Sequence, residues 1–309
     1  MSPLLKSFIV SPSELRSALD AQQPHGPGPR IIPLSAEWYL PNDPRKGSEE
    51  FTKLRIPGAR FFDIDVVKDE NSPYPHMLPT AETFANSLNE LGVREEDTVV
   101  LYDSPHIGIF SAPRAAWTFK VFKHERVHLL NNFKLWVEQG FETESGMVER
   151  SWEAVANPHV KEADKSLVAK FEDVVELARG KSNGVEILDA RPAARWSGKA
   201  PEPRPEISSG HVPGSDEIPR WRPQTCVANY RTSVGSKSVP FVELLDPTTK
   251  AFKSPSELRQ IFLNKGVDLS SKTEKVLMCG TGVTAVVVEN ALLLAGAEGH
   301  RKVYDGSWT

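Results

Sequence analysis

Cysteine is scarce in this chain: the 309 residues include only Cys226 and Cys279. Two cysteines are too few for a disulfide framework or a structural zinc site. Such usage is typical of a reducing compartment, and it leaves Cys279 free to react. The sequence also lacks any run of the roughly 18 apolar residues that a membrane-spanning helix needs, so we expect no membrane partner.

A strong net charge is also lacking, since the formal value is −4. The chain therefore has no basic footprint for nucleic acid, and we expect no direct nucleic-acid partner. Its first ten residues are too short and too weakly basic for a signal or transit peptide. We expect a soluble protein of the cytoplasm, with the mitochondrion as the alternative. The length favours two domains over one.

Apolar runs that predict strands alternate with amphipathic stretches that predict helices. In the first half the predicted strands are 31–34, 98–103 and 127–130, and capped helices are predicted to begin at Ser11 and Thr80. The residues between the first strand and Ile56 are rich in turn formers and predict a loop. This alternation predicts an α/β fold with mainly parallel sheets that carry helices on both faces.

The same order of elements occurs twice, which indicates a tandem duplication of one α/β domain. Corresponding positions are Pro57 and Pro213, Gly92 and Gly266, and Asp103 and Cys279. We predict an N-terminal domain at 1–157 and a C-terminal domain at 165–309, separated by a polar stretch.

The offset between the copies changes along the chain, because Pro213 follows Pro57 by 156 residues whereas Gly266 follows Gly92 by 174. The second copy therefore contains about 20 extra residues, for which the candidate is the aperiodic stretch at about 216–236. Two interpretations remain open: a surface insertion, or an unspliced intron in the gene model. Sequencing the mature transcript distinguishes them.

One loop combines a cysteine with two glycines: Cys279-Gly280-Thr281-Gly282-Val283-Thr284-Ala285. It follows an apolar run that predicts a buried strand and precedes one that predicts a buried helix. Amide N–H groups at a helix start favour negative charge, so a thiol held there can act as a thiolate nucleophile. The alternative is a buried structural cysteine. The glycines argue against it, because a core strand needs no close backbone approach.

Two tandem α/β domains with a single cysteine loop in the second resemble the sulfurtransferases of the rhodanese superfamily. The loop is similar to the Cys-Gly-Ser-Gly-Val-Thr-Ala of 3-mercaptopyruvate sulfurtransferases, whereas thiosulfate enzymes carry basic residues after the cysteine. The resemblance implies two rhodanese-like domains and a persulfide on Cys279. Sulfur would pass from 3-mercaptopyruvate to a thiol, thioredoxin or a sulfur-carrier protein, with release of pyruvate. It implies no metal or organic cofactor.

The resemblance also implies substrate-binding residues. Amides of the loop residues Gly280, Gly282, Val283 and Thr284 would hold the persulfide. The segments 189–196 and 200–204 resemble the family segment that binds the substrate carboxylate, and by motif position its two arginines are Arg195 and Arg204. The alternative is that both arginines form surface or interdomain ion pairs. Arg191 is interpreted as structural.

A second family signature matches 61–65 and 72–79 in the first domain. By the resemblance, Asp65 and His76 supply the carboxylate and imidazole of a catalytic triad whose hydroxyl is that of Thr281. Many relatives have serine there, and the extra methyl group of threonine restricts χ1. Without the motif, His76 would be an ordinary loop histidine.

Asp103 stands where the second copy has Cys279, and a carboxylate cannot accept a sulfane sulfur, so the first domain is expected to be catalytically silent. A thiosulfate sulfurtransferase, which passes sulfur from thiosulfate to cyanide, remains the alternative within the family. A cysteine phosphatase is disfavoured because its Cys-x5-Arg loop would require arginine where Ala285 stands. A non-catalytic binding module also remains open.

Overall fold

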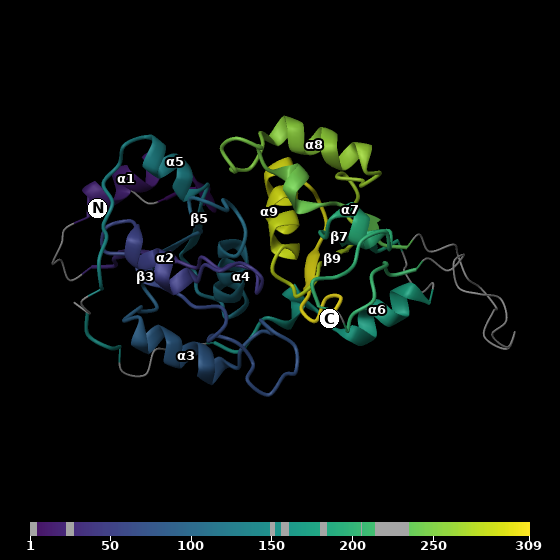
Figure 1. The fold of residues 1–309 in the computed structure, drawn as a ribbon, viewed down its shortest axis with the longest axis horizontal. Helices are drawn as coiled ribbons and strands as arrows, with labels where there is room; N and C mark the ends of the chain where they lie inside the picture. The colour runs from purple at the N-terminus through teal and green to yellow at the C-terminus, as the bar shows by residue number, and fades with distance from the viewer. Residues whose placement is uncertain are drawn as a thin grey trace, which may run out of the picture. The chain divides into compact units, whose positions relative to one another are not determined.

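The computed structural model describes residues 5–22, 28–148, 152–155, 161–179, 184–204, 206–213 and 235–309. They form two compact units (Figure 1). Unit 1 comprises Met1–Asp164 together with Leu245–Phe252, and unit 2 comprises Lys165–Leu244 together with Lys253–Thr309. The eight residues Leu245–Phe252 lie within the range predicted for the second domain.

Unit 1 is built on a parallel five-stranded sheet. Its strands, in spatial order, are β1 (Ile9–Val10), β5 (Val127–Leu130), β4 (Thr98–Tyr102), β2 (Ile31–Ser35) and β3 (Arg60–Phe61). Its helices are α1 (Pro12–Asp20), α2 (Gly47–Lys53), α3 (Ala81–Glu90), α4 (Ala112–Val121) and α5 (Phe133–Glu138).

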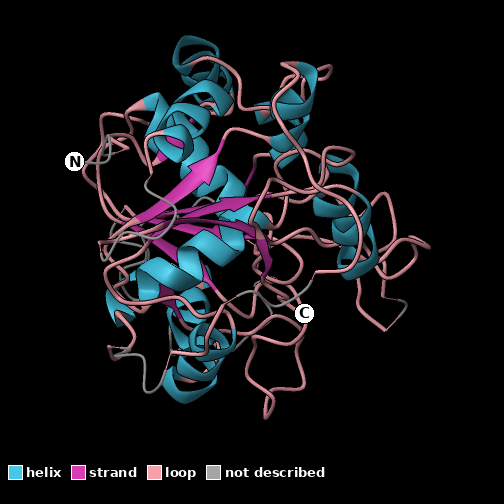
Figure 2. Ribbon diagram, turned by 90° about the vertical axis from the view of Figure 1, so that its left-hand side faces the viewer, coloured by secondary structure: helices cyan, strands magenta, loops and turns pink. Residues whose placement is uncertain are grey.

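Helices lie on both sides of the strands (Figure 2). On one face of the unit 1 sheet, Val100 and Tyr102 pack in a core with residues of α1, α2 and α5. Neighbouring residues of a strand point to opposite faces, and Val99 and Leu101 are also fully buried, on the face where α4 packs against β4 and β5. Central strands covered on both faces explain why the apolar runs in the sequence are continuous rather than alternating.

Unit 2 repeats this architecture. Its parallel sheet has the order β6 (Val168–Ala169), β10 (Arg301–Tyr304), β9 (Lys275–Met278), β7 (Glu186–Asp189) and β8 (Lys237–Ser238). Its helices are α6 (Phe171–Ala178), α7 (Ala193–Trp196), α8 (Pro255–Asn264) and α9 (Ala285–Ala295), with 3-10 turns η1 (Lys165–Leu167) and η3 (Phe241–Leu244). The predicted α/β class with parallel sheets is confirmed. None of the helices described is both long and apolar enough to cross a bilayer.

The backbone locates the extra residues of the second copy. In unit 1 the Ala59 N–H donates to the Ile56 carbonyl at 3.0 Å, and in unit 2 the Ser236 N–H donates to the Val212 carbonyl at 3.0 Å. Val212 follows Ile56 by 156 residues, whereas Ser236 follows Ala59 by 177, so 21 additional residues lie between Val212 and Ser236. Ser236 itself belongs to the repeated fold. Residues 216–234 of the predicted insertion, with Cys226, lie outside the described residues.

Local signals place the helix starts. Ser11 caps α1 through a capping box, because its hydroxyl accepts from the Glu14 N–H and the Glu14 carboxylate accepts from the Ser11 N–H at 2.8 Å. The capped starts predicted at Ser11 and Thr80 are confirmed. α2 lies in the region predicted to be a loop. It is seven residues long and buries only Phe51, so no apolar periodicity marks it.

Candidate functional site

The Cys279 loop joins β9 to α9 at the carboxyl end of the unit 2 sheet. β9 is fully buried, Cys279 is 2% exposed, and the next helical residue is Ala285. α9 is almost wholly apolar and packs against the sheet and α8, which anchors the end of the loop. Gly282 has φ +72°, in the left-handed region, so the turn needs a glycine there.

Ser307 holds the loop from the neighbouring strand. Its Oγ accepts hydrogen bonds from the Cys279 N–H at 3.1 Å and the Gly282 N–H at 3.0 Å, and it donates to the Tyr304 carbonyl at 2.9 Å. Ser307 is 4% exposed and has φ +51°, which is unfavourable for a residue other than glycine. The sequence analysis missed this residue. The signal was its place just after β10, the strand beside β9.

The last two residues continue this support. The Trp308 N–H donates to the Cys279 carbonyl at 3.1 Å, and the Thr309 N–H donates to the Gly280 carbonyl at 3.2 Å. The indole of Trp308 lies under the guanidinium of Arg191, with Cζ 4.2 Å from the ring centroid. The carbonyl side of the cysteine turn is therefore held by the backbone of Trp308 and Thr309.

Several amides at the start of α9 remain available. In the part of the chain that the structure describes, no hydrogen bond engages the N–H of Gly280, Val283 or Thr284. Such amides favour an anion, because the N-terminal end of a helix carries partial positive charge.

The corresponding turn of unit 1 already contains an anion. The Asp103 carboxylate accepts from the N–H groups of Phe110 (2.8 Å), Ser111 (3.0 Å) and Ala112 (2.9 Å) at the start of α4. It also accepts from the Ser111 hydroxyl at 2.7 Å. Burial raises the pKa of Asp103 to about 6. The fold therefore places a carboxylate against helix amides in unit 1 where unit 2 has a thiol.

Three arginines of unit 2 differ in how fully they are paired. Arg191 is fully buried, with Nη2 2.6 Å from Asp189 Oδ2 and Nη1 2.8 Å from Glu202 Oε1. Arg195 is paired more loosely, with Nη1 3.6 Å from Glu202 Oε2, and its buried Nε has no hydrogen-bond partner among the described residues. The half-buried Arg204 forms no ion pair with any described residue. Among the described residues, Arg195 and Arg204 thus keep donors without a partner, whereas the donors of Arg191 are occupied.

Unit 1 brings Asp65 and His76 together. His76 Nε2 lies 2.8 Å from Asp65 Oδ1, and this hydrogen bond lowers the pKa of Asp65. Trp38, which the sequence analysis missed, donates from Nε1 to the other oxygen of Asp65 at 2.8 Å. Its ring also meets the His76 ring edge-on at 4.8 Å. Arg114 donates to the His76 carbonyl at 2.5 Å. Thr281, the third predicted member of the triad, belongs to unit 2.

Among the described residues, no group of three or more histidine, cysteine, aspartate or glutamate side chains could hold a metal ion. The loop itself offers a thiol and backbone amides.

Comparison with known proteins adds named relatives. The chain is 35% identical over 317 residues to "Thiosulfate sulfurtransferase TUM1" of Saccharomyces cerevisiae, covering 97% of this chain and 93% of the relative. It is 38% identical over 283 residues to "Probable 3-mercaptopyruvate sulfurtransferase" of Schizosaccharomyces pombe, covering 91% and 86%. No protein-family model matches the chain.

Solved structures show the same architecture. The crystal structure of the Tum1 protein from Saccharomyces cerevisiae matches with a TM-score of 0.81 at 32% identity, over 97% of this chain and 93% of that one. A sulfur transferase subunit of yeast mitochondrial complex I matches with a TM-score of 0.77 at 36% identity, over 98% and 95%. The rhodanese-fold 3-mercaptopyruvate sulfurtransferase SseA from Escherichia coli matches with a TM-score of 0.75 at 30% identity, over 98% and 100%.

Proposed function

Because the chain belongs to the rhodanese-fold sulfurtransferases, we propose that it takes sulfur from 3-mercaptopyruvate and carries it as a persulfide on Cys279. The predicted family, the tandem fold and the sulfurtransferase activity are confirmed by these relatives. The enzyme acts on a sulfur donor and a sulfur acceptor. The identity of the donor and the roles of individual residues are proposals.

In the proposed first step the Cys279 thiolate attacks the sulfur of 3-mercaptopyruvate. An S–S bond forms, the C–S bond breaks, and its electron pair goes to the carbon of the departing pyruvate enolate. The enolate then takes up a proton to give pyruvate. In the second step an acceptor thiolate attacks the outer sulfur of the persulfide and releases the Cys279 thiolate.

The turn around Cys279 is the observation that carries this proposal. Amides of Gly280, Val283 and Thr284 are available at the helix start, and Gly282 allows the backbone to fold around the sulfur. The partial positive charge at the start of α9 would stabilise a persulfide anion, as the amides at the start of α4 stabilise the Asp103 carboxylate in unit 1. The duplicated copy thus supports an anion-binding role for this turn.

Arg195 and Arg204 support a donor that carries a carboxylate away from its sulfur. Guanidinium groups pair well with carboxylates, and these two keep donors available. Thiosulfate would instead favour cations beside the cysteine, where this chain has Gly280 and Thr281. Thiosulfate is the second candidate donor, because the Saccharomyces cerevisiae relative is named a thiosulfate sulfurtransferase.

For the proton of pyruvate we propose a triad in which Thr281 supplies the hydroxyl, His76 the imidazole and Asp65 the carboxylate. The 2.8 Å contact between His76 and Asp65 supports this, because the carboxylate holds the ring in place and stabilises its protonated form. For the acceptor we propose thioredoxin, another thiol or a sulfur-carrier protein. Of the two compartments considered, cytoplasm and mitochondrion, the mitochondrial one is supported by the likeness to the complex I subunit.

Mass spectrometry after incubation with 3-mercaptopyruvate tests the persulfide. We expect an adduct of about 32 Da, one sulfur atom, on Cys279. It should be lost in Cys279→Ser and retained in Cys226→Ser. An adduct absent from Cys279 contradicts the mechanism. If the protein also transfers no sulfur from either donor, the result favours the non-catalytic binding module.

Steady-state kinetics test the donor. We expect kcat/KM for 3-mercaptopyruvate to exceed that for thiosulfate. Replacement of one carboxylate-binding arginine, as in Arg195→Gln or Arg204→Gln, should raise KM by about tenfold or more. Arg179→Gln removes an exposed arginine of the same unit and should leave KM unchanged. Preference for thiosulfate, or a KM insensitive to both arginines, would reject this donor assignment.

A further inference from the structure

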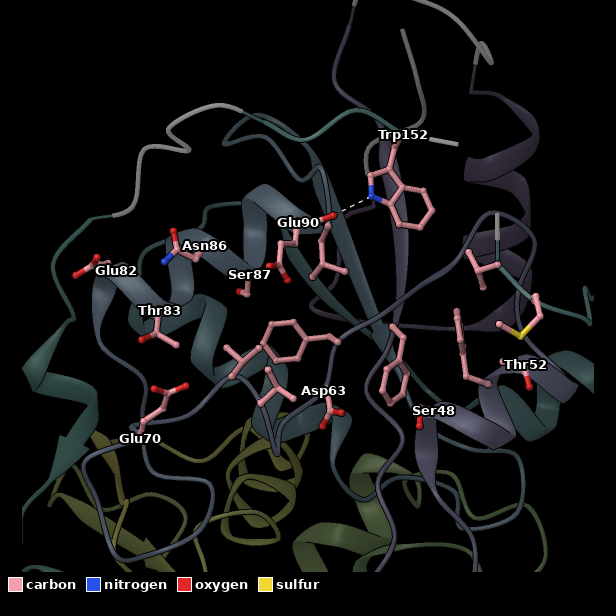
Figure 3. A pocket seen from close by; sticks show the side chains of 18 residues that line it. Ser48, Thr52, Asp63, Glu70, Glu82, Thr83, Asn86, Ser87, Glu90 and Trp152 are labelled. Carbon is pink, nitrogen blue, oxygen red and sulfur yellow. Dashed lines mark hydrogen bonds between the residues drawn. The ribbon is translucent and has the colours of Figure 1, made fainter. Parts of the chain in front are cut away.

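A groove on unit 1 is lined by acidic, neutral polar and apolar side chains, and none of the described residues that line it is cationic (Figure 3). Its volume is about 840 Å³. One wall is α3, which contributes residues from a single face, since positions three and four apart lie together on a helix. These are Glu82, Thr83, Asn86, Ser87 and Glu90. Opposite them are Ser48, Phe51 and Thr52 of α2.

Three glutamates line this groove. Glu70, Glu82 and Glu90 are exposed, and none of them forms an ion pair with a described residue. Asp63 also lines the groove but is half-buried, and burial raises its pKa. The groove therefore presents a local negative field that favours a cationic ligand.

The same groove exposes large apolar side chains. Val66 is 63% exposed and Met147 is 84% exposed, and both line it. Phe61 is partly buried beside them, and the Trp152 indole closes one end by donating to the Glu90 carbonyl at 3.0 Å (Figure 3). Contiguous apolar surface rimmed by polar groups marks an interaction site more often than ordinary surface.

We propose that this groove docks a basic, amphipathic peptide segment of a partner protein. Glu82 and Glu90 are eight residues apart on α3, which places them about 12 Å apart along the helix axis. An extended peptide advances about 3.3 Å per residue, so two basic residues about four positions apart reach both glutamates. Apolar side chains between them can then contact Val66 and Met147. A small monovalent amine cannot satisfy both ends of such a groove.

Isothermal titration calorimetry on the full chain tests this inference independently of the sulfur chemistry. The probe is a blocked peptide of about eight residues that alternates lysine and leucine. Comparison peptides replace lysine by glutamate or leucine by serine. We expect saturable binding of the lysine–leucine peptide that weakens with added salt, and binding at least about tenfold weaker for either comparison peptide.

Paired variants locate the binding. The double variant Glu82→Gln with Glu90→Gln should lower the affinity for the lysine–leucine peptide about five- to tenfold. Glu95→Gln with Glu96→Gln removes the same charge from the same unit outside the groove and should change affinity less than about twofold. Met147→Ser tests the apolar contact and should also weaken binding. Circular dichroism verifies that each variant is folded.

Four results would overturn the inference: no saturable binding, equal binding of the glutamate peptide, no loss in the Glu82 and Glu90 variant, or no loss when leucine is replaced by serine. Displacement of the peptide by spermidine at an equal or lower concentration would also overturn it, since the occupant would then be a free polyamine.

Discussion

Replacement of Ser307 by alanine should weaken both the stability of unit 2 and the geometry of the cysteine loop. The substitution removes one hydroxyl that accepts from Cys279 and Gly282 and donates to Tyr304. Two buried N–H donors and one carbonyl would lose this partner. The Tyr304 carbonyl keeps the hydrogen bond from the Ser307 N–H at 3.2 Å, so only the two N–H donors are left without a partner. Because a buried polar group without a partner costs about 1–3 kcal/mol, the expected loss is about 2 kcal/mol even at the lower end.

Differential scanning calorimetry measures the stability effect. For a unit of this size a loss of 2 kcal/mol lowers Tm by roughly 4–8 °C. Ser307→Gly removes the same hydroxyl but relieves the strain of φ +51°, so it should be more stable than Ser307→Ala by about 1 kcal/mol. Ser256→Ala, at an exposed position of α8, is the matched control and should leave Tm within about 1 °C.

Alkylation reports the geometry of the loop. Cys279 is 2% exposed, so iodoacetamide should modify it slowly in the native protein. In Ser307→Ala we expect faster modification, together with a fall of about tenfold or more in kcat for sulfur transfer, because a displacement of the nucleophile by about 1 Å is costly. If Tm, alkylation and kcat all match those of the native protein, Ser307 does not hold the loop.

Two further perturbations concern unit 1. Burial, followed by the Asp103 charge, raises the pKa of Glu37 to about 8, above the value of about 4.3 in an unfolded chain. The native state therefore holds a proton on Glu37 that the unfolded chain has lost, and the unfolding free energy should fall as pH rises from about 4.3 to about 8. Asp103 contributes a fall in the same direction, but only up to about pH 6. Between about pH 6 and pH 8 the unfolding free energy of the native protein, measured with urea, should fall by on the order of 2 kcal/mol, and Glu37→Gln should remove this fall. An unchanged slope in the variant would contradict the assignment. Gly92→Ala should lower the unfolding free energy by about 2–4 kcal/mol, because φ is +60° and a Cβ would lie 2.6 Å from Trp152 Cδ1. Gly58→Ala, with φ +69° and open space around it, should cost only about 1–2 kcal/mol, so equal costs for the two would show that the Trp152 contact is unimportant.

The strands of both sheets were predictable because burial on two faces leaves a continuous apolar run. β5 lies at the predicted residues 127–130, and β2 extends the predicted 31–34 by one residue. Helix starts were predictable where a local capping signal exists, as at Ser11. α2 was not, since a short helix that buries one side chain leaves no period to detect.

Contacts between distant residues could not be read from the sequence. Ser307 is 28 residues from Cys279 and reaches it only because β10 pairs with β9. Trp38 reaches Asp65 across 27 residues for a similar reason. The end of the insertion was ambiguous for another reason. Gly-Ser occurs at both 214–215 and 235–236, so either pair could belong to the repeated fold. Only the hydrogen bond between Ser236 and Val212 assigns the second pair to the repeated fold.

The two copies also explain why one carries the nucleophile and the other does not. In unit 1 the Asp103 carboxylate occupies the amides at the start of α4, and its charge, after burial, raises the pKa of Glu37. A second anion at that turn would meet filled donors and like charge. In unit 2 the position of Glu37 holds Arg191, and the turn from Cys279 to α9 is three residues shorter than its counterpart. The unit 2 turn therefore combines a nucleophile with open amides, and the substitution of aspartate by cysteine is only one part of that difference.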